Sequence, residues 1–259
     1  MQVSIFASGS SGNCLLLSSG VSHILIDAGI SMRRISAGLT QAGISWRDIG
    51  GVLITHEHSD HISGLKTLLH QRALPVYAPR TVSNRLRGML PGIDDCLHIV
   101  PVGGPFLVAG FRVCAFHTPH DTDESVGYRV ESGGVFALAT DMGQVTEEVV
   151  RGLCGADTVL IEANHDPEML RMGSYPAYLK MRILSDHGHL SNPDCAELAR
   201  HLCENGTRRI VLGHISRENN RPELALQTVR AALTAYSAEL YCAPAEGFLS
   251  LPVGKDSLC

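Results

Sequence analysis

A short run of polar residues, THEHSDH at positions 55–61, places the strongest limit on how this chain can fold. The run continues from the apolar segment VLIT (52–55), which is typical of a buried strand. In an extended loop, alternate residues point the same way, so His56 and His58 can converge on one ion, while Asp60 and His61 face a second ion. Imidazole nitrogens with a carboxylate suit zinc, or iron or manganese where the site holds more oxygen. The sequence therefore predicts a metal-binding loop at the end of a buried strand.

Four further polar residues stand at or just after the end of an apolar strand. They are Asp27 after HILI, His120 in FHTPHD, Asp141 after FALAT and His214 after IVLG. Open sheets place their binding sites at such strand ends. Each residue taken alone is as typical of a turn, but together with the 55–61 run the series predicts the rest of a ligand set.

Short β-rich runs alternate with helical stretches along the whole chain. Strands are predicted at 3–8, 14–19, 23–29, 52–55, 75–79, 97–100, 106–116, 126–132, 133–140, 156–164, 208–216, 238–244 and 247–252. Helices are predicted at 32–42, 62–70, 81–89, 146–154, 176–185, 192–205 with Asn192 as the cap, and 222–234. The pattern favours an α/β (α+β) architecture in which two sheets pack together and helices cover the outside. Without internal repeats or a long linker, one domain over 1–259 is expected.

The composition limits the expected cellular compartment and binding partners of the protein. No apolar run is long enough for a membrane span, and the first residues lack a basic segment followed by an apolar core, so neither a membrane partner nor a signal peptide is expected. The 8 cysteines form no CxxC pair and mostly lie in apolar segments, which favours reduced thiols in a cytoplasmic protein. A net charge of −5 argues against a protein that coats nucleic acid. The basic segment 66–87, however, is either a solvated helix face or a phosphate footprint.

The ordered series from Asp27 to His214 resembles the five motifs of the metallo-β-lactamase fold superfamily. Within it, SGSSGN (8–13), HDTDESVGY (120–128), GHLSN (188–192) and GHISRENN (213–220) resemble the YycJ (WalJ) family of bacterial hydrolases, which is related to the phosphodiesterases tRNase Z and RNase J. The resemblance covers nearly the whole chain. It implies a four-layer αββα sandwich of two mixed sheets flanked by helices, without the β-CASP insertion of RNase J.

The resemblance also implies a site with two divalent metal ions, zinc or else manganese or iron. Its ligands would be two triads and one bridging residue: His56, His58 and His120; Asp60, His61 and His214; and Asp141 between the ions. Asp27 would orient the 55–61 loop without binding an ion. A hydroxide held between the ions would be the nucleophile, and Asp60 counts among the catalytic residues for that reason. His117 competes with His120 for its place, but its position inside a strand favours a structural role.

A carboxylate and an imidazole complete the implied catalytic set. In tRNase Z-like phosphodiesterases, a glutamate after the fourth-motif aspartate pairs with a histidine before the fifth-motif histidine, and these positions correspond to Glu162 and His189. A histidine so polarised can protonate a leaving alkoxide. Glu162 is alternatively a structural ion-pair partner. His165 and His187 lie nearby in the sequence and are candidates for contact with a phosphate.

Two small-residue turns are candidates for binding the substrate, since glycine-rich turns expose NH groups to anions. Their polar residues are Ser8, Ser10, Ser11 and Asn13 in the first turn, and Ser216, Asn219 and Asn220 after His214. The alternative for the first turn is a tight hairpin with no ligand.

Three functions remain open at this stage. The leading one is a metal-dependent phosphodiesterase acting on nucleic acid, with family resemblance favouring DNA and exonuclease action on double-stranded ends. The second is a small-molecule hydrolase that cleaves a thioester, lactone or cyclic phosphodiester. The third is an inactive metal-binding accessory protein, which would be expected to lack a ligand position, whereas every position here is filled. The sequence leaves the oligomeric state open, and a homodimer is compatible with it.

Overall fold

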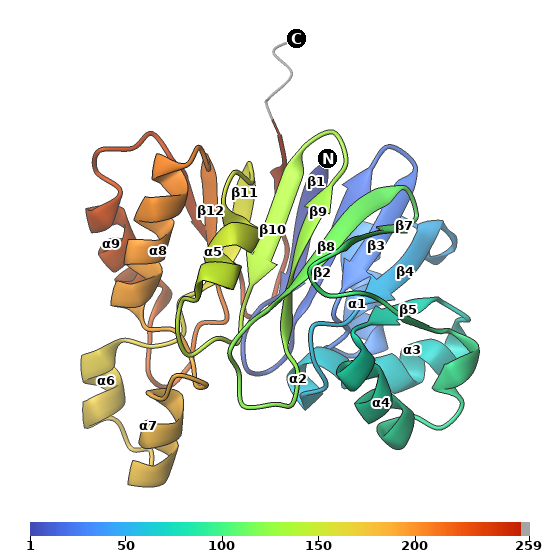
Figure 1. Ribbon diagram of the computed structural model, residues 1–259, viewed down its shortest axis with the longest axis horizontal. Helices are drawn as coiled ribbons and strands as arrows, with labels where there is room; N and C mark the ends of the chain where they lie inside the picture. The colour runs from blue at the N-terminus through green and yellow to red at the C-terminus, as the bar shows by residue number, and fades with distance from the viewer. Residues whose placement is uncertain (255–259) are drawn as a thin grey trace.

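Two mixed sheets of seven strands each face one another in the computed structural model, which describes residues 1–254 (Figure 1). The first sheet has the order β14 (Leu249–Pro252), β1 (Gln2–Ala7), β2 (Cys14–Ser19), β3 (Ser22–Ile26), β4 (Ile49–Leu53), β5 (Val76–Ala78) and β6 (Leu97–Ile99). The second has the order β13 (Glu239–Cys242), β12 (Arg209–Gly213), β11 (Thr158–Glu162), β10 (Val135–Ala139), β9 (Val126–Glu131), β8 (Phe111–His117) and β7 (Pro105–Val108).

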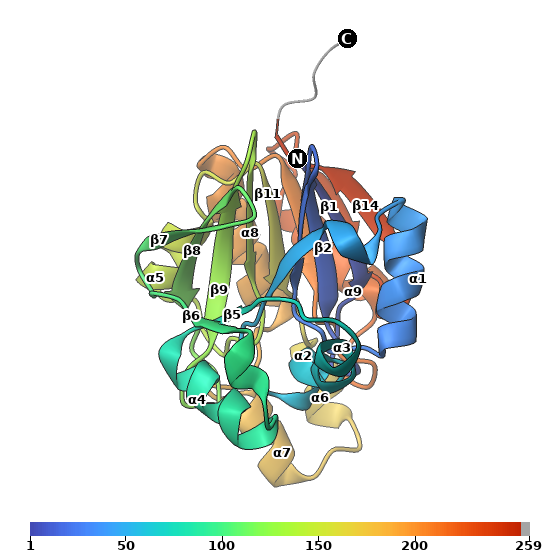
Figure 2. The ribbon, with the colours of Figure 1, turned by 90° about the vertical axis from the view of Figure 1, so that its right-hand side faces the viewer.

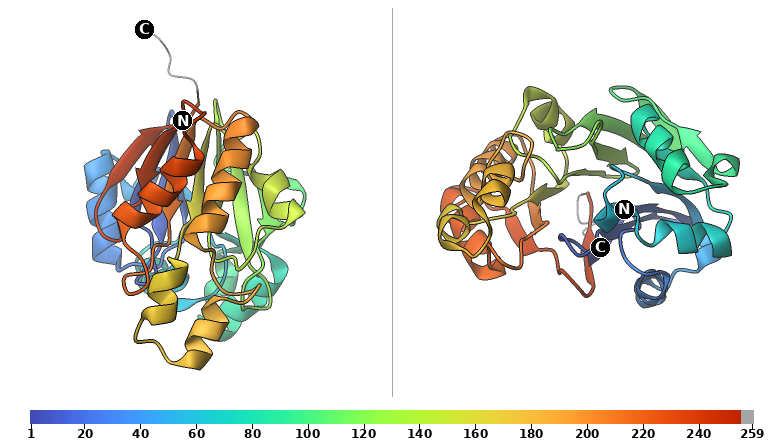
Figure 3. Two further views of the ribbon diagram at one scale, coloured as in Figure 1. Left: turned by 90° about the vertical axis from the view of Figure 1, so that its left-hand side faces the viewer. Right: turned by 90° about the horizontal axis from the view of Figure 1, so that it is seen from below.

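Helices cover the outer face of each sheet (Figure 3). The helices that follow strands of the first sheet are α1 (Met32–Ala42), α2 (Ser59–Ile62), α3 (Leu65–Gln71) and α4 (Arg80–Met89). Those of the second sheet are α5 (Glu147–Leu153), α8 (Asn192–Glu204) and α9 (Pro222–Ala232). Two short helices, α6 (Pro167–Met172) and α7 (Ala177–Ile183), extend from the same end of the molecule as α2 and α4 (Figures 1 and 2). The predicted four-layer αββα architecture is confirmed.

The alternation of side chains along the strands produces three apolar layers. In β3, Ile24 and Ile26 point into the core between the sheets, while Leu25 points to the core beneath the helices of the first sheet. Because side chains of a strand point alternately to its two faces, a strand that is apolar on both faces must be covered twice. Both sheets of this protein are covered in this way, by the other sheet on one side and by helices on the other.

Several predicted elements needed correction. The helix expected at 62–70 begins at Leu65 as α3 and is preceded by a separate short helix, α2, that ends at Ile62. Between them the N–H of Gly64 donates to the carbonyl oxygen of Ala28 at 2.8 Å and so takes no part in a helical hydrogen bond. The strand expected at 106–116 is a hairpin of β7 and β8, turned at Ala109 and Gly110 with positive φ at both. The cap of α8 is Ser191 rather than Asn192. Helix α6 was not predicted, since it is only one and a half turns long.

The parallel strands fix where the site lies. Strands β3, β4 and β5 run parallel in the first sheet, and β10, β11 and β12 run parallel in the second. Parallel neighbours end at the same edge, so the residues that follow them are brought together there. In the part of the chain that the structure describes, no helix is long and apolar enough to cross a membrane. The seven cysteines within residues 1–254 form no disulfide.

Candidate metal centre and active site

The candidate site is built on strained turns that directly follow strands. Among residues 1–254, four non-glycine residues have positive φ, and three of them are Asp27 at 59°, Asp141 at 57° and His214 at 52°. Each of the three follows the carboxyl end of β3, β10 or β12. A left-handed conformation is unfavourable for a residue with a Cβ and concentrates at functional sites. At each of these positions the backbone turns away from the strand direction, and the side chain is directed over the edge of the sheet.

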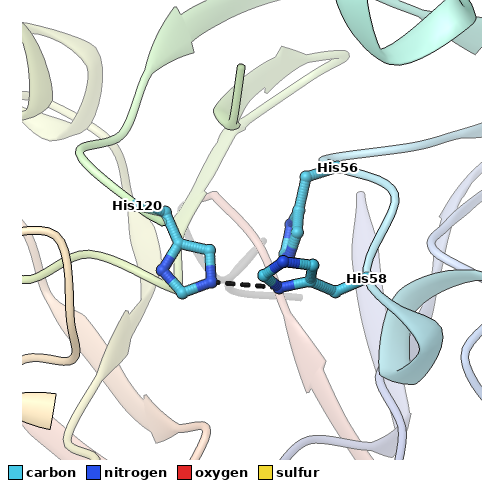
Figure 4. A group of neighbouring side chains, drawn as sticks. All are labelled: His56, His58 and His120. Carbon is cyan, nitrogen blue, oxygen red and sulfur yellow. Dashed lines mark hydrogen bonds between the residues drawn. The ribbon is translucent and has the colours of Figure 1, made fainter. Parts of the chain in front are cut away.

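Three imidazoles form the first cluster (Figure 4). His56 and His58 come from the loop after β4, and His120 comes from the loop after β8. The ring of His120 faces that of His58, with Nε2 and Nδ1 3.2 Å apart. One ligand atom from each of the three residues lies within 4.8 Å of the others. His117, in contrast, has a half-exposed side chain paired with Glu148 and takes no part in the cluster.

A second cluster lies beside the first, and one of its members, Asp141, also approaches the first. Its four members, Asp60, His61, Asp141 and His214, again bring their ligand atoms within 4.8 Å of one another. An oxygen of Asp141 lies 3.2 Å from Nε2 of His61, and the other oxygen lies 3.4 Å from Nε2 of His214. That second oxygen is also 3.8 Å from Nε2 of His120 in the first cluster. Asp141 therefore stands between the two groups, where a bridging carboxylate would have to be.

The chemistry of these side chains fits two divalent metal ions. Nε2 of His56 is buried without a hydrogen-bond partner among the described residues, which is unfavourable unless a cation satisfies it. In His56 and His120, the other ring nitrogen, Nδ1, already has a polar neighbour. His56 Nδ1 lies 3.1 Å from the Thr55 hydroxyl, and His120 Nδ1 lies 3.3 Å from the Gly188 carbonyl oxygen. Such contacts fix the tautomer and leave the inward nitrogen free to bind metal.

Asp27 lies behind this site and holds the loop that contains it. Its Oδ2 accepts a 2.8 Å hydrogen bond from Nδ1 of His61, and its Oδ1 accepts one from the backbone N–H of Thr55. Burial lowers the pKa of His61, but the carboxylates of Asp27 and Asp141 outweigh it and raise the pKa to about 10. Gly29 completes the contact, because a Cβ there would lie 1.6 Å from the carbonyl oxygen of Asp60. Asp27 thus positions the ligands without facing the metal sites.

The Asp27→Asn variant is expected to lower metal affinity by about 10- to 100-fold, since it removes the charge that orients and polarises His61. Asparagine tolerates the left-handed backbone at this position, so the fold should persist. Competition with a chromogenic chelator measures the affinity. Asp48→Asn is the matched control, because this exposed carboxylate caps the turn at the other end of β4. An affinity equal to that of the control would show that Asp27 does not support the site.

Glu162 and His189 meet next to the second cluster. Nδ1 of His189 donates to Oε1 of Glu162 at 2.7 Å, and Nδ1 of His214 lies 3.1 Å from the same oxygen. Oε2 accepts the N–H of Met142. Because both Glu162 oxygens are used, the carboxylate is better placed to orient two histidines than to bind an ion, although its atoms also lie within ligand distance of Asp141 and His214.

The charge states of Glu162 and His189 depend on two opposing effects, burial and the charges of neighbouring side chains. Burial raises the pKa of Glu162, but His189 and His214 outweigh it and hold the pKa at about 2. For His189, burial lowers the pKa, and the Glu162 carboxylate outweighs it and raises the pKa above the usual range. The side chain of His189 is 22% exposed. With Nδ1 bonded to Glu162, Nε2 is the nitrogen that can exchange a proton with a bound substrate.

Most residues predicted to bind substrate are used inside the protein. The Ser8 hydroxyl accepts the N–H of His214, and the Asn13 amide lies 3.0 Å from Nε2 of His61. The Asn220 side chain bonds Asn192 and the Ala163 carbonyl oxygen. Ser216 and Asn219 are also buried, Ser11 and His187 are exposed, and His165 is buried with both ring nitrogens unpartnered among the described residues. Of this set, Ser10 alone lines the pocket over the metal-binding residues.

That pocket also contains two residues that the sequence did not single out. It has a volume of about 160 Å³, and Asp121 and Arg182 line it together with Ser10 and the side chains of both clusters. A larger cavity of about 830 Å³ lies between α5 and α8 and contains none of the metal-binding residues. Arg182 escaped notice because it belongs to α7, whose sequence contains no motif; only the fold places it beside the site.

Known proteins with related sequences identify the family of this chain. Residues 22–215 match the family model described as the beta-lactamase superfamily domain. The chain is 38% identical to exodeoxyribonuclease YycJ of Bacillus anthracis over 235 residues, covering 90% of this chain and 89% of that protein. It is 40% identical to exodeoxyribonuclease WalJ of Streptococcus pneumoniae serotype 2 (strain D39) over 230 residues, covering 87% and 86%.

A solved structure supports the same architecture. The metallo-β-lactamase fold protein YhfI of Bacillus subtilis superimposes with a TM-score of 0.72 at 15% identity, covering 96% of this chain and 99% of that one. At that identity the likeness concerns the fold. The two sequence relatives, in contrast, match over nearly their full length. The chain therefore belongs to the beta-lactamase superfamily and, within it, to the YycJ/WalJ family of metal-dependent hydrolases.

Proposed function

We propose that this protein is a dinuclear metal-dependent phosphodiesterase that removes nucleotides from the ends of DNA. The observation that carries the proposal is the 2.7 Å contact between His189 and Glu162 at the border of the metal-binding clusters. When a phosphodiester of DNA is cleaved, the sugar oxygen leaves as an alkoxide, which is a strong base. A proton donor therefore contributes most in that reaction. The two relatives named as exodeoxyribonucleases support DNA as the polymer.

The residues of the site would have different roles in the reaction. The histidine triad and the second cluster would hold the two ions, with Asp141 shared between them. Zinc suits the imidazole-rich donors, while the carboxylates of Asp60 and Asp141 also accommodate manganese or iron. When bound, a pair of divalent cations supplies activated water at neutral pH and stabilises negative charge on the phosphate. His189 would then deliver its Nε2 proton to the leaving oxygen, while Glu162 holds the ring in position.

The size of the pocket favours a polymer over an enclosed small molecule. Sites that bury a small ligand usually measure about 300–1,000 Å³. The pocket over the clusters measures about 160 Å³, which is below that range but leaves room for a phosphate group. A nucleic acid can place one phosphodiester there while the rest of the chain lies outside. The small-molecule hydrolase is therefore the less favoured of the two functions.

Cleavage of end-labelled duplex DNA, with zinc, manganese and iron supplied in turn, tests the proposal. We expect release of nucleotides from linear DNA, loss of the activity with a chelator, and no cleavage of covalently closed circular DNA of the same sequence. RNA of that sequence and a thioester substrate serve as competing arms. Turnover of the thioester without any cleavage of DNA would overturn the proposal, as would equal cleavage of closed circles.

A further inference from the structure

Arg182 is a cationic residue at the metal-binding pocket for which the proposed reaction provides no role. It lies on α7, and its guanidinium is the one arginine group that lines the pocket within residues 1–254. Its side chain is 60% exposed and pairs with Asp121. Both Nε and Nη2 contact the same carboxylate oxygen, Oδ2. No contact of the remaining nitrogen, Nη1, is found among the described residues, so its two N–H groups are available to a further anion.

Asp121 holds this arginine close to the metal-binding residues. Its other oxygen, Oδ1, lies 3.3 Å from Nε2 of His120 and makes no hydrogen bond within the described chain. The loop that carries Asp121 is fixed from the opposite side as well. Arg85 of α4 pairs with Asp123, and the Thr122 hydroxyl donates to Glu57 at 2.6 Å. The loop that carries Asp121 is therefore held by two residues from the first half of the chain, Glu57 and Arg85.

The backbone around Arg182 is tied to the proposed proton donor. The N–H of His189 donates to the carbonyl oxygen of Ile183 at 3.0 Å. Gly188 packs against the last turn of α7 so closely that a Cβ would lie 2.3 Å from the carbonyl oxygen of Arg182. The position of the arginine relative to His189 is therefore fixed by the main chain, which makes it suited to positioning a substrate rather than to a mobile surface contact.

We propose that Arg182 binds a non-bridging oxygen of the DNA phosphate adjacent to the one that is cleaved, with Asp121 holding the guanidinium in place. This inference rests on the proposed function. Metal ions in the two clusters would take up the scissile phosphate, and the arginine lies at the rim, where the next part of a nucleic acid chain must pass. The planar guanidinium matches phosphate geometry, and such charge-assisted contacts are stronger than neutral ones.

Steady-state cleavage of duplex DNA by Arg182→Ala, at several salt concentrations, tests the inference. We expect KM to rise about 10- to 100-fold, as for loss of a charge-assisted hydrogen bond, with little change in kcat. The slope of log KM against log salt should fall by about one unit, because one phosphate contact is lost. Arg182→Lys should recover part of the affinity. Metal content and turnover of bis-p-nitrophenyl phosphate, which has no adjacent phosphate, should be unchanged.

Arg112→Ala is the matched control, since Arg112 is an exposed, ion-paired arginine at the start of β8, the end of that strand opposite the His120 loop. A KM and salt slope for Arg182→Ala equal to those of this control would overturn the inference and leave the proposed function intact. Loss of metal, or an equal loss on bis-p-nitrophenyl phosphate, would also overturn it, because Arg182 would then act through Asp121 on His120. If the wild-type protein cleaves no DNA, the proposed function fails and the inference fails with it.

Discussion

Replacing Asp60 with alanine should remove one of two metal ions and lower activity on every phosphodiester by about 1,000-fold or more. The carboxylate lies 3.4 Å from Nε2 of His214 and 3.5 Å from Nε2 of His61, so it belongs to the cluster that would bind the second ion. A bound cation contributes several kcal/mol to the transition state, and each 1.4 kcal/mol corresponds to about tenfold in rate. Elemental analysis of the purified variant measures the metal content, and cleavage of bis-p-nitrophenyl phosphate measures the rate.

The fold should survive this change, because the structural contacts of Asp60 are made by its backbone. Its carbonyl oxygen accepts the N–H of Asn13 at 2.8 Å, and alanine keeps that bond. Asp94→Ala is the control, since it removes an exposed carboxylate paired with Arg87 on α4. Two ions retained in Asp60→Ala, with activity equal to that of the control, would contradict the dinuclear assignment.

Replacing His189 with alanine should lower the rate of cleavage by an amount that depends on the leaving group of the substrate. Cleavage of DNA is expected to lose about 10²- to 10⁴-fold in kcat, the usual contribution of a general acid. Bis-p-nitrophenyl phosphate should lose much less, because p-nitrophenolate is a weak base that leaves without a proton. Metal content should stay unchanged, since Nδ1 of His189 is bonded to Glu162; a loss of metal would instead place an ion in the third group that the structure offers, which is Asp141, Glu162, His189 and His214. The ratio of the two losses, measured in one preparation, is the decisive quantity.

His201→Ala on α8 is the control for a lost imidazole, because His201 is exposed and remote from the clusters. Equal losses on the two substrates would contradict proton donation by His189. Glu162→Gln is a less specific test of the proton donor. The same Glu162 oxygen also contacts His214, so this change disturbs a metal-binding residue together with the proton donor. A moderate loss on both substrates is therefore expected for Glu162→Gln.

The sequence was sufficient to predict those parts of the protein that depend on local pattern. Alternating apolar residues predicted most strands, and the polar residues after them predicted which side chains the structure brings together in the two clusters. This succeeded because a strand end delivers its next side chain to a known edge of the sheet, whatever the rest of the chain does. Prediction failed where one apolar pattern is compatible with two backbone paths, as at 62–70, where the N–H of Gly64 bonds to the distant Ala28 carbonyl oxygen and the helix is divided.

The roles of individual polar atoms depended on tertiary structure. Ser8 and Asn13 looked like substrate ligands, yet their polar groups bond His214 and lie against His61, contacts that join distant parts of the sequence. Arg182 lies in a segment without a motif and reaches the pocket only because α7 packs against the loop of His189. The sequence by itself determined which residues stand at the strand ends and hence the metal-binding set. Only the tertiary structure decided which ring nitrogen of each histidine faces the pocket and which arginine lines it, because hydrogen-bond partners far apart in the chain fix both.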